Sequence, residues 1–176
     1  MRLLRWSGMR SFPQSPASTL LIAVALVLLT ATTASADFTA FIGLNGTPER
    51  RAVKGLAIGT GLLIVGFEVE YADTSEDEEL LAPRLRTIMF NGLVQTPVPI
   101  AGMQFYGTIG GGGYRESFNT VPEISETNFG TNIGGGAKIS IAGPLRVRVD
   151  YRVFNLRGNP RHSPVQRFYA GVNLKF

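Results

Sequence analysis

The sequence predicts an all-β fold, an eight-stranded antiparallel up-and-down transmembrane β-barrel that follows a cleaved signal peptide. Residues 166–176 alternate between apolar and polar, seven further strand-like segments precede them, and the connections alternate between long and short. Eleven residues match the length that a tilted strand needs to cross a bilayer, about 9–11. Because a sheet in lipid cannot leave an edge unpaired, we expect the last strand to pair with the first.

Residues 1–36 have the layout of a secretory signal peptide. Basic residues at Arg2, Arg5 and Arg10 lead into an apolar run over residues 20–29, and Ala34 and Ala36 are small residues of the kind a signal peptidase reads. The apolar run is too short for a membrane-spanning helix, which needs about 20 residues. The sequence therefore predicts two parts, a signal peptide at 1–36 and a barrel domain at 37–176.

The composition excludes several classes of function. After removal of the signal peptide's arginines, 14 basic and 13 acidic residues remain, so nothing in the charge favours a nucleic-acid partner. The chain has no cysteine, which excludes a lipoprotein anchor, disulfides and thiolate metal sites. His162, the single histidine, has no Ser or Asp at a spacing typical of a catalytic triad. We therefore expect no enzyme activity, no cofactor and no metal site.

Turn residues divide the domain into the expected strands. Short connections near Gly66, at 97–102 and near Gly143 are expected on the periplasmic side, and the four longer ones on the outside. The expected strands are 37–45, 54–64, 67–73, 84–96, 103–118, 128–141, 145–156 and 166–176.

Segment 145–156 shows most clearly which face points inward. Arg146, Arg148 and Arg152 alternate with valines and a tyrosine. Arginine on the lipid face costs about 2–4 kcal/mol at mid-bilayer. The arginines must therefore face the barrel interior and the valines the lipid.

Charges inside a barrel need partners, because an unpaired buried charge is costly. Segments 67–73 and 145–156 lie on opposite sides of an eight-stranded ring, and a lumen this narrow can be bridged by long side chains. We therefore predict an ion-paired cluster near the periplasmic end, with Lys175 nearby; its members are Glu68, Glu70, Lys138, Arg146, Arg148, Asp150 and Arg152. The cluster either fills the barrel and fixes its register or gates a narrow ion path.

Three other features have simpler interpretations. The glycine runs at 110–113 and 134–136 lack the lysine and helix of a phosphate loop, so we expect them to bend the wall. The acidic stretch 73–79 lacks the spacing of a calcium loop and is expected to be solvated. Basic residues in or near two loops are candidates for contact with lipid phosphates: Arg50, Arg51, Lys54, Arg157, Arg161 and Arg167.

Taken together, the signal peptide, the eight alternating segments, the unequal connections and the terminal Phe176 resemble the small OmpA-like and OmpX-like outer-membrane barrels of Gram-negative bacteria. The resemblance implies location in the cell outer membrane, a monomer, and contact with outer-membrane lipids and lipopolysaccharide. It also implies recognition by the barrel-assembly machinery through the last strand, where Phe168, Leu174 and Phe176 match. No peptidoglycan-binding domain follows the barrel segment, so a tether to the cell wall is not implied.

The expected function is that of a non-enzymatic outer-membrane barrel in the cell envelope, with a structural, envelope-integrity or surface-interaction role. One alternative is a narrow, porin-like gated pore or a passage for small solutes. A second alternative is a soluble periplasmic lipid binder of the lipocalin type, which would have an apolar interior and a polar outside. The direction in which the valines of 145–156 point distinguishes this carrier from a membrane barrel.

Overall fold

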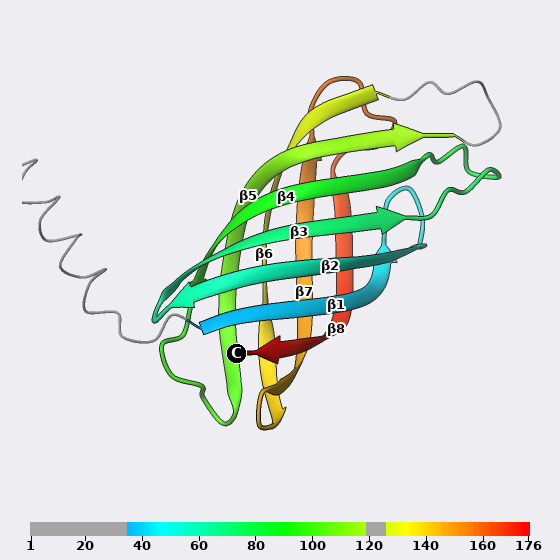
Figure 1. Cartoon of the computed structure of the whole chain (residues 1–176). Helices are drawn as coiled ribbons and strands as arrows, with labels where there is room; N and C mark the ends of the chain where they lie inside the picture. Colours follow the sequence, from blue (N-terminus) through cyan, green and yellow to red (C-terminus); the bar gives the residue numbers. More distant parts are fainter. Residues whose placement is uncertain (1–34, 119–125) are drawn as a thin grey trace, which may run out of the picture. The chain divides into compact units, whose positions relative to one another are not determined.

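A computed structural model describes residues 35–118 and 126–176, which form eight strands (Figure 1). Each strand pairs antiparallel with its neighbours, and β8 returns to β1 to close a barrel, so the predicted fold class is confirmed. Residues 1–34 of the expected signal peptide lie outside the described residues. The strands are β1 (Ser35–Asn45), β2 (Arg51–Leu62), β3 (Val65–Thr74), β4 (Arg84–Gln95), β5 (Met103–Ser117), β6 (Glu126–Ala142), β7 (Leu145–Leu156) and β8 (Val165–Lys175).

The seam between the first and last strands is continuous. It runs from the pair Asp37 and Lys175 at one end to the pair Asn45 and Arg167 at the other. Beyond the ladder, the Phe176 amide donates to the Ala36 carbonyl at 2.9 Å, and the Ala36 amide donates to the Phe176 carbonyl at 2.8 Å. The barrel therefore has no unpaired strand edge, as a wall surrounded by lipid requires.

Most strand boundaries fall within a few residues of those predicted, but one turn was misplaced. The β2–β3 turn consists of Leu63 and Ile64, not of Val65 and Gly66. Leu63 adopts a left-handed backbone conformation with φ of 51°. An apolar run does not ordinarily signal such a turn, and the glycines of β2 obscured the alternation that would have ended the strand earlier.

The wall is apolar outside and polar inside. On β7, Arg148 and Arg152 are fully buried, whereas Tyr151 between them is 45% exposed. The outer wall carries large exposed apolar side chains on every strand, including Ile42, Phe67, Phe90 and Ile109. This arrangement is the reverse of that of a soluble lipid carrier, so the lipocalin-type alternative is wrong. No helix among the described residues is long and apolar enough to cross a membrane.

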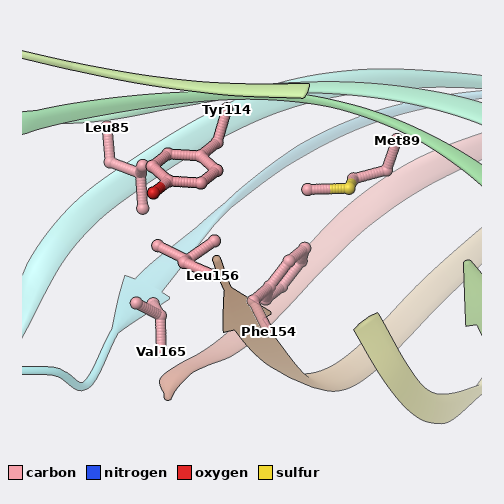
Figure 2. Packing of buried hydrophobic residues seen from close by; sticks show 6 residues of the cluster. All are labelled: Leu85, Met89, Tyr114, Phe154, Leu156 and Val165. Carbon is pink, nitrogen blue, oxygen red and sulfur yellow. The ribbon is translucent and has the colours of Figure 1, made fainter. Parts of the chain in front are cut away.

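The interior has two zones along the barrel axis. At the end with the long connections, apolar side chains of β4 and β5 face those of β7 and the start of β8 (Figure 2). At the edge of this zone, the Tyr114 hydroxyl donates a hydrogen bond to the Arg157 carbonyl at 2.5 Å. The cluster consists of Leu85, Met89, Tyr114, Phe154, Leu156 and Val165. The rest of the interior is filled mainly by polar and charged side chains, which form the candidate site.

Candidate functional site: the ion-paired interior

Arg148 on β7 lies at the centre of the charged zone. Its side chain is fully buried and forms an ion pair with Glu68 on β3, which is four strands away around the ring. Its Nη2 donates to Asp150 Oδ2 at 3.1 Å, and its Nε donates to the Tyr106 hydroxyl at 2.7 Å. The Tyr106 ring also lies 4.8 Å from the guanidinium carbon, within the range of a cation–π contact.

Arg152 links this centre to a second glutamate. Its Nη2 donates to Glu68 Oε1 at 2.9 Å and its Nε to Asp150 Oδ1 at 2.9 Å. Its Nη1 lies 3.2 Å from Glu70 Oε2. Glu68 is therefore held by two guanidinium groups, while Arg148 is held by two carboxylates and Arg152 by three. Such mutual pairing is what makes burial of these charges possible.

Arg167 on β8 extends the network, although the sequence analysis assigned it to a lipid-facing basic patch. It is fully buried, and its Nη1 donates to Glu70 Oε1 at 3.0 Å. Its Nε donates to Asn45 Oδ1 at 3.1 Å, and its guanidinium carbon lies 4.2 Å from the centre of the Phe154 ring. The patch interpretation was wrong for Arg167 because this residue shares the inward face of β8 with Tyr169 and Asn173. That alternation was the available signal.

A separate ion-paired group lies at the end with the short turns. Asp37 on β1 pairs with Lys138 and with Arg146, whose Nη2 lies 3.2 Å from Asp37 Oδ2. Arg146 also donates from Nε to Asn173 Oδ1 at 2.7 Å. The structure thus places Arg146 with Asp37, which the sequence analysis missed, and not beside Glu68 and Glu70. The stagger between strands of a barrel displaces residues that a flat ring would set at equal depth.

Lys175 was expected near the predicted cluster; its backbone lies opposite that of Asp37, and its side chain is exposed at the end of β8. Asp37 itself carried no distinctive sequence signal, since it is simply the first residue after the expected cleavage site. Tyr106 and Tyr169 were also missed as members of the site. Their hydroxyls donate to Asp150 Oδ2 and Glu70 Oε2, respectively, and each of these oxygens is also contacted by an arginine.

Glycines on β6 make room for these large side chains. A β-carbon on Gly134 would lie 2.7 Å from Arg152 Cγ and 2.2 Å from the Tyr151 carbonyl oxygen. One on Gly136 would lie 2.6 Å from the Tyr106 hydroxyl oxygen. Gly134 and Gly136 therefore leave the space that the Arg152 and Tyr106 side chains occupy in the interior.

Little free volume remains around the group at the end with the short turns. A cavity lined by Asp37, Glu68, Lys138 and Arg146, among others, measures about 10 Å³. This volume holds about one water molecule. The charged side chains therefore block this part of the interior.

Within the described ranges 35–118 and 126–176, no group of three or more His, Cys, Asp or Glu is placed so that it could hold a metal ion. In the acidic loop, Asp77 Oδ1 accepts a hydrogen bond from the Leu80 amide at 3.1 Å, which shapes a turn. Partial burial, with Arg51 and Arg161 nearby, lowers the pKa of His162 below its ordinary value.

No protein-family model and no curated protein matches the sequence. Solved structures are similar in fold. The N-terminal β-barrel domain of Pseudomonas aeruginosa OprF aligns with a TM-score of 0.62 at 16% identity, over 82% of this chain and 100% of that one. Neisserial surface protein A aligns with a TM-score of 0.64 at 15% identity, over 81% and 97%. The outer membrane enzyme PagL aligns with a TM-score of 0.50 at 14% identity, over 78% and 98%.

These similarities extend over the whole barrel, and the identities are low enough that they concern the fold alone. The same barrel occurs in PagL, an enzyme, so the fold does not decide between catalytic and non-catalytic roles. With its closed eight-stranded ring, apolar outer wall and polar interior, the chain has the fold of the small outer-membrane β-barrels.

Proposed function

We propose that the protein is a closed, non-enzymatic barrel of the outer membrane, with a structural or surface-interaction role in the cell envelope. The observation that carries the proposal is the bridging of the interior by Glu68, which two guanidinium groups from the opposite wall hold. Glu68, Arg148 and Arg152 are almost completely buried, so opening the bridge would leave several buried charges uncompensated.

The apolar zone supports closure independently. Leu85 and Tyr114 pack against Leu156 and Val165 across the outer end of the barrel. An ion passing along the axis would have to cross both this apolar cluster and the charged network. The alternative of a gated pore would require two chemically different barriers to open together, and for this reason we favour a sealed lumen.

The outer wall supports a location in the outer membrane. The exposed apolar wall needs a hydrocarbon surrounding, and small barrels with this fold include PagL, described as an outer membrane enzyme. An absence of catalysis fits the one loop histidine, His162, which lies outside the interior network. We propose that the barrel acts as a monomer and is inserted by the barrel-assembly machinery, as the resemblance implies.

Recording in planar bilayers tests the closed state. Purified wild-type protein is expected to give no steady conductance, and Arg50→Ala, which removes an exposed loop charge, should behave identically. Arg148→Ala should leave the membrane sealed if the apolar zone suffices as a second barrier. Steady wild-type conductance would refute closure. If the wild-type protein is sealed and only the Arg148→Ala variant conducts, this arginine is the barrier.

Location is tested separately by washing isolated envelopes with alkaline carbonate. The protein should stay with the membrane pellet and show a heat-dependent shift on a gel, which reports a folded barrel. Release into the soluble fraction would contradict a membrane-spanning barrel, whatever the conductance measurements show.

A further inference from the structure

The three short turns lie at the same end of the barrel and present apolar side chains there (Figure 1). Leu63 in the β2–β3 turn and Val98 in the β4–β5 turn are each 68% exposed, and Ile141 beside the β6–β7 turn is 59% exposed. None of the turn residues 63–64, 96–102 and 143–144 is charged, whereas the long connections 46–50, 75–83 and 157–164 each contain charged residues. The two ends of the barrel therefore suit different surroundings.

The backbone of these turns is also adapted to an apolar surrounding. The carbonyl oxygens of Ile64, Gly102 and Pro144 each accept a hydrogen bond from an amide of the strand that follows the hairpin, at 2.7, 3.0 and 2.9 Å. Pro97, Pro99 and Pro144 have no amide hydrogen that would need a partner. Hydrocarbon offers no water to an unsatisfied backbone group. Pairing of the carbonyls and removal of donors by proline therefore lower the cost of placing the turns in lipid.

The length of the apolar wall leads to the same placement. Lys54 on β2 and Asp73 on β3 are register partners on the outward face, two positions from the exposed Leu56 and Tyr71. Leu63 follows Lys54 by nine positions. Nine residues rise about 30 Å along a strand, and a tilt of about 35–45° reduces this to about 21–24 Å across the membrane. Because the apolar band of a transmembrane barrel is about 25 Å tall, the hydrocarbon on these strands must reach the turn itself.

We propose that the three short turns are embedded in the membrane leaflet that faces them, among the acyl chains of its lipids, and do not project into the aqueous space. On β2 and β3 the outward residues between the charged pair and the turn are uncharged, so the turn continues the apolar wall. Lys175 lies beside Pro144, and its long side chain can reach the head-group level from there. The proposal rests on the membrane location proposed above and adds the depth at which the barrel sits.

A lipid leaflet fits these turns better than a second protein does. A protein interface surrounds its apolar centre with a polar rim, whereas the turns are apolar throughout and belong to three separate hairpins around the ring. An added strand would need free backbone groups at this end, but the carbonyls of Ile64, Gly102 and Pro144 are already bonded. Contact with surrounding acyl chains requires neither a polar rim nor free backbone groups.

Quenching of tryptophan fluorescence tests the placement. Trp6 is the single tryptophan of the chain, so each variant is made in the full-length protein on a Trp6→Phe background. The barrel is reconstituted in phosphatidylcholine vesicles, with brominated acyl chains as the quencher in lipid and acrylamide as the quencher in water. Val98→Trp reports on the β4–β5 turn, and Phe90→Trp reports on the outer wall, where this position is 64% exposed. Leu81→Trp, in the β3–β4 loop, replaces an apolar residue that is 67% exposed and is the matched control.

The turn variant should behave like the wall variant. We expect brominated lipid to quench Val98→Trp and Phe90→Trp but not Leu81→Trp. Acrylamide should quench Val98→Trp roughly threefold less than Leu81→Trp, because the turn is removed from water. Ile64→Trp, in the β2–β3 turn, should give the same result. Since Leu81 matches Val98 in exposure and apolar character, a tendency of tryptophan itself to enter the membrane would affect both variants.

A charge at the same position gives a second measurement. Val98→Asp should lower the urea midpoint of unfolding in vesicles, because its carboxylate would have to enter hydrocarbon or pull the turn out of it. Leu81→Asp should leave the midpoint unchanged. The heat-dependent gel shift shows whether each variant has folded, and the tryptophan variants test the placement even if Val98→Asp does not fold.

Each outcome decides the proposal. Equal acrylamide quenching of Val98→Trp and Leu81→Trp would overturn it, as would an unchanged urea midpoint for Val98→Asp. Protection of Val98→Trp from both acrylamide and brominated lipid would show that protein covers the turn, and this too would refute contact with lipid. If the barrel did not span the membrane, Phe90→Trp would also escape the brominated lipid, so the two failures can be told apart.

Discussion

Arg148 and Glu68 meet in the middle of the barrel although their strands, β7 and β3, stand on opposite sides of the ring. Both side chains are almost completely buried, and Arg152 joins the same carboxylate at 2.9 Å. The pair therefore connects opposite walls, and the interior is held together by charge as well as by the strand ladder.

We expect Glu68→Gln to destabilise the barrel by about 3–5 kcal/mol, because it leaves Arg148 and Arg152 without a shared counter-charge. Urea unfolding in lipid vesicles, followed by the heat-dependent gel shift, measures the loss. Adding Arg148→Gln should cost less than the two single changes summed, by about 0.5–3 kcal/mol. Strict additivity would mean that the two side chains do not act as a pair.

A glycine pair on neighbouring strands tests how tightly the interior is filled. Gly134→Ala should lower the free energy of unfolding by about 1–3 kcal/mol, because the new methyl group would lie against Arg152 and the Tyr151 carbonyl. Gly113→Ala is the control, since a β-carbon there has no atom within 4 Å. Equal stability of the two variants in urea would contradict close packing at Gly134.

The apolar zone gives a prediction at a single position. Leu156→Ala should cost about 2–5 kcal/mol, since it opens a cavity in the cluster of Figure 2. Leu156→Met keeps the volume and should cost less than about 1.5 kcal/mol. The comparison is made by urea unfolding, and similar losses for both variants would show that this zone is loosely packed.

Phe176 allows assembly to be separated from stability. Its side chain is 71% exposed, so Phe176→Ala should change unfolding in vesicles by less than about 0.5 kcal/mol. If the last strand is read by the assembly machinery, as the resemblance implies, the same variant should accumulate poorly in the outer membrane of cells. Quantitative blotting of membrane fractions measures this. Normal accumulation would remove Phe176 from the assembly signal.

His162 is expected to make the stability of the barrel depend weakly on pH. Partial burial and the nearby charges of Arg51 and Arg161 lower its pKa, so folding disfavours the protonated form. The resulting contribution to stability is complete above the ordinary histidine pKa and is lost as pH falls through the window down to the lowered pKa. An NMR titration should show this pKa moving upward in Arg161→Gln. An unchanged pKa would exclude the effect of Arg161.

The sequence predicted the ring and its sidedness because alternation has a period of two wherever one face meets lipid. The alternation of arginines and valines on 145–156 alone determined which face was inside. The partners of those arginines were harder to predict, because they depend on the stagger between strands that are distant in sequence. Arg146 thus contacts Asp37, which is 109 positions away.

Arg167 illustrates a different difficulty. Its alternation with Tyr169 and Asn173 places it inside, yet its position just after a loop suggested a surface role. Alternation was the better guide, because the strand begins at Val165, one residue before the predicted boundary. The turn at Leu63 and Ile64 was missed because neither residue is of a type that is common in turns.

The charged filling also constrains how the protein enters its membrane. Until β7 and β8 have met β3, a partly assembled sheet would turn Arg148, Arg152 and Arg167 toward hydrocarbon without Glu68 and Glu70, and only Asp150 of β7 would lie beside the first two. Stepwise threading of single hairpins into the bilayer would therefore face a high energetic barrier. The strands and their ion-paired interior side chains must therefore assemble together. Closure of the barrel and its insertion into the membrane are then a single step.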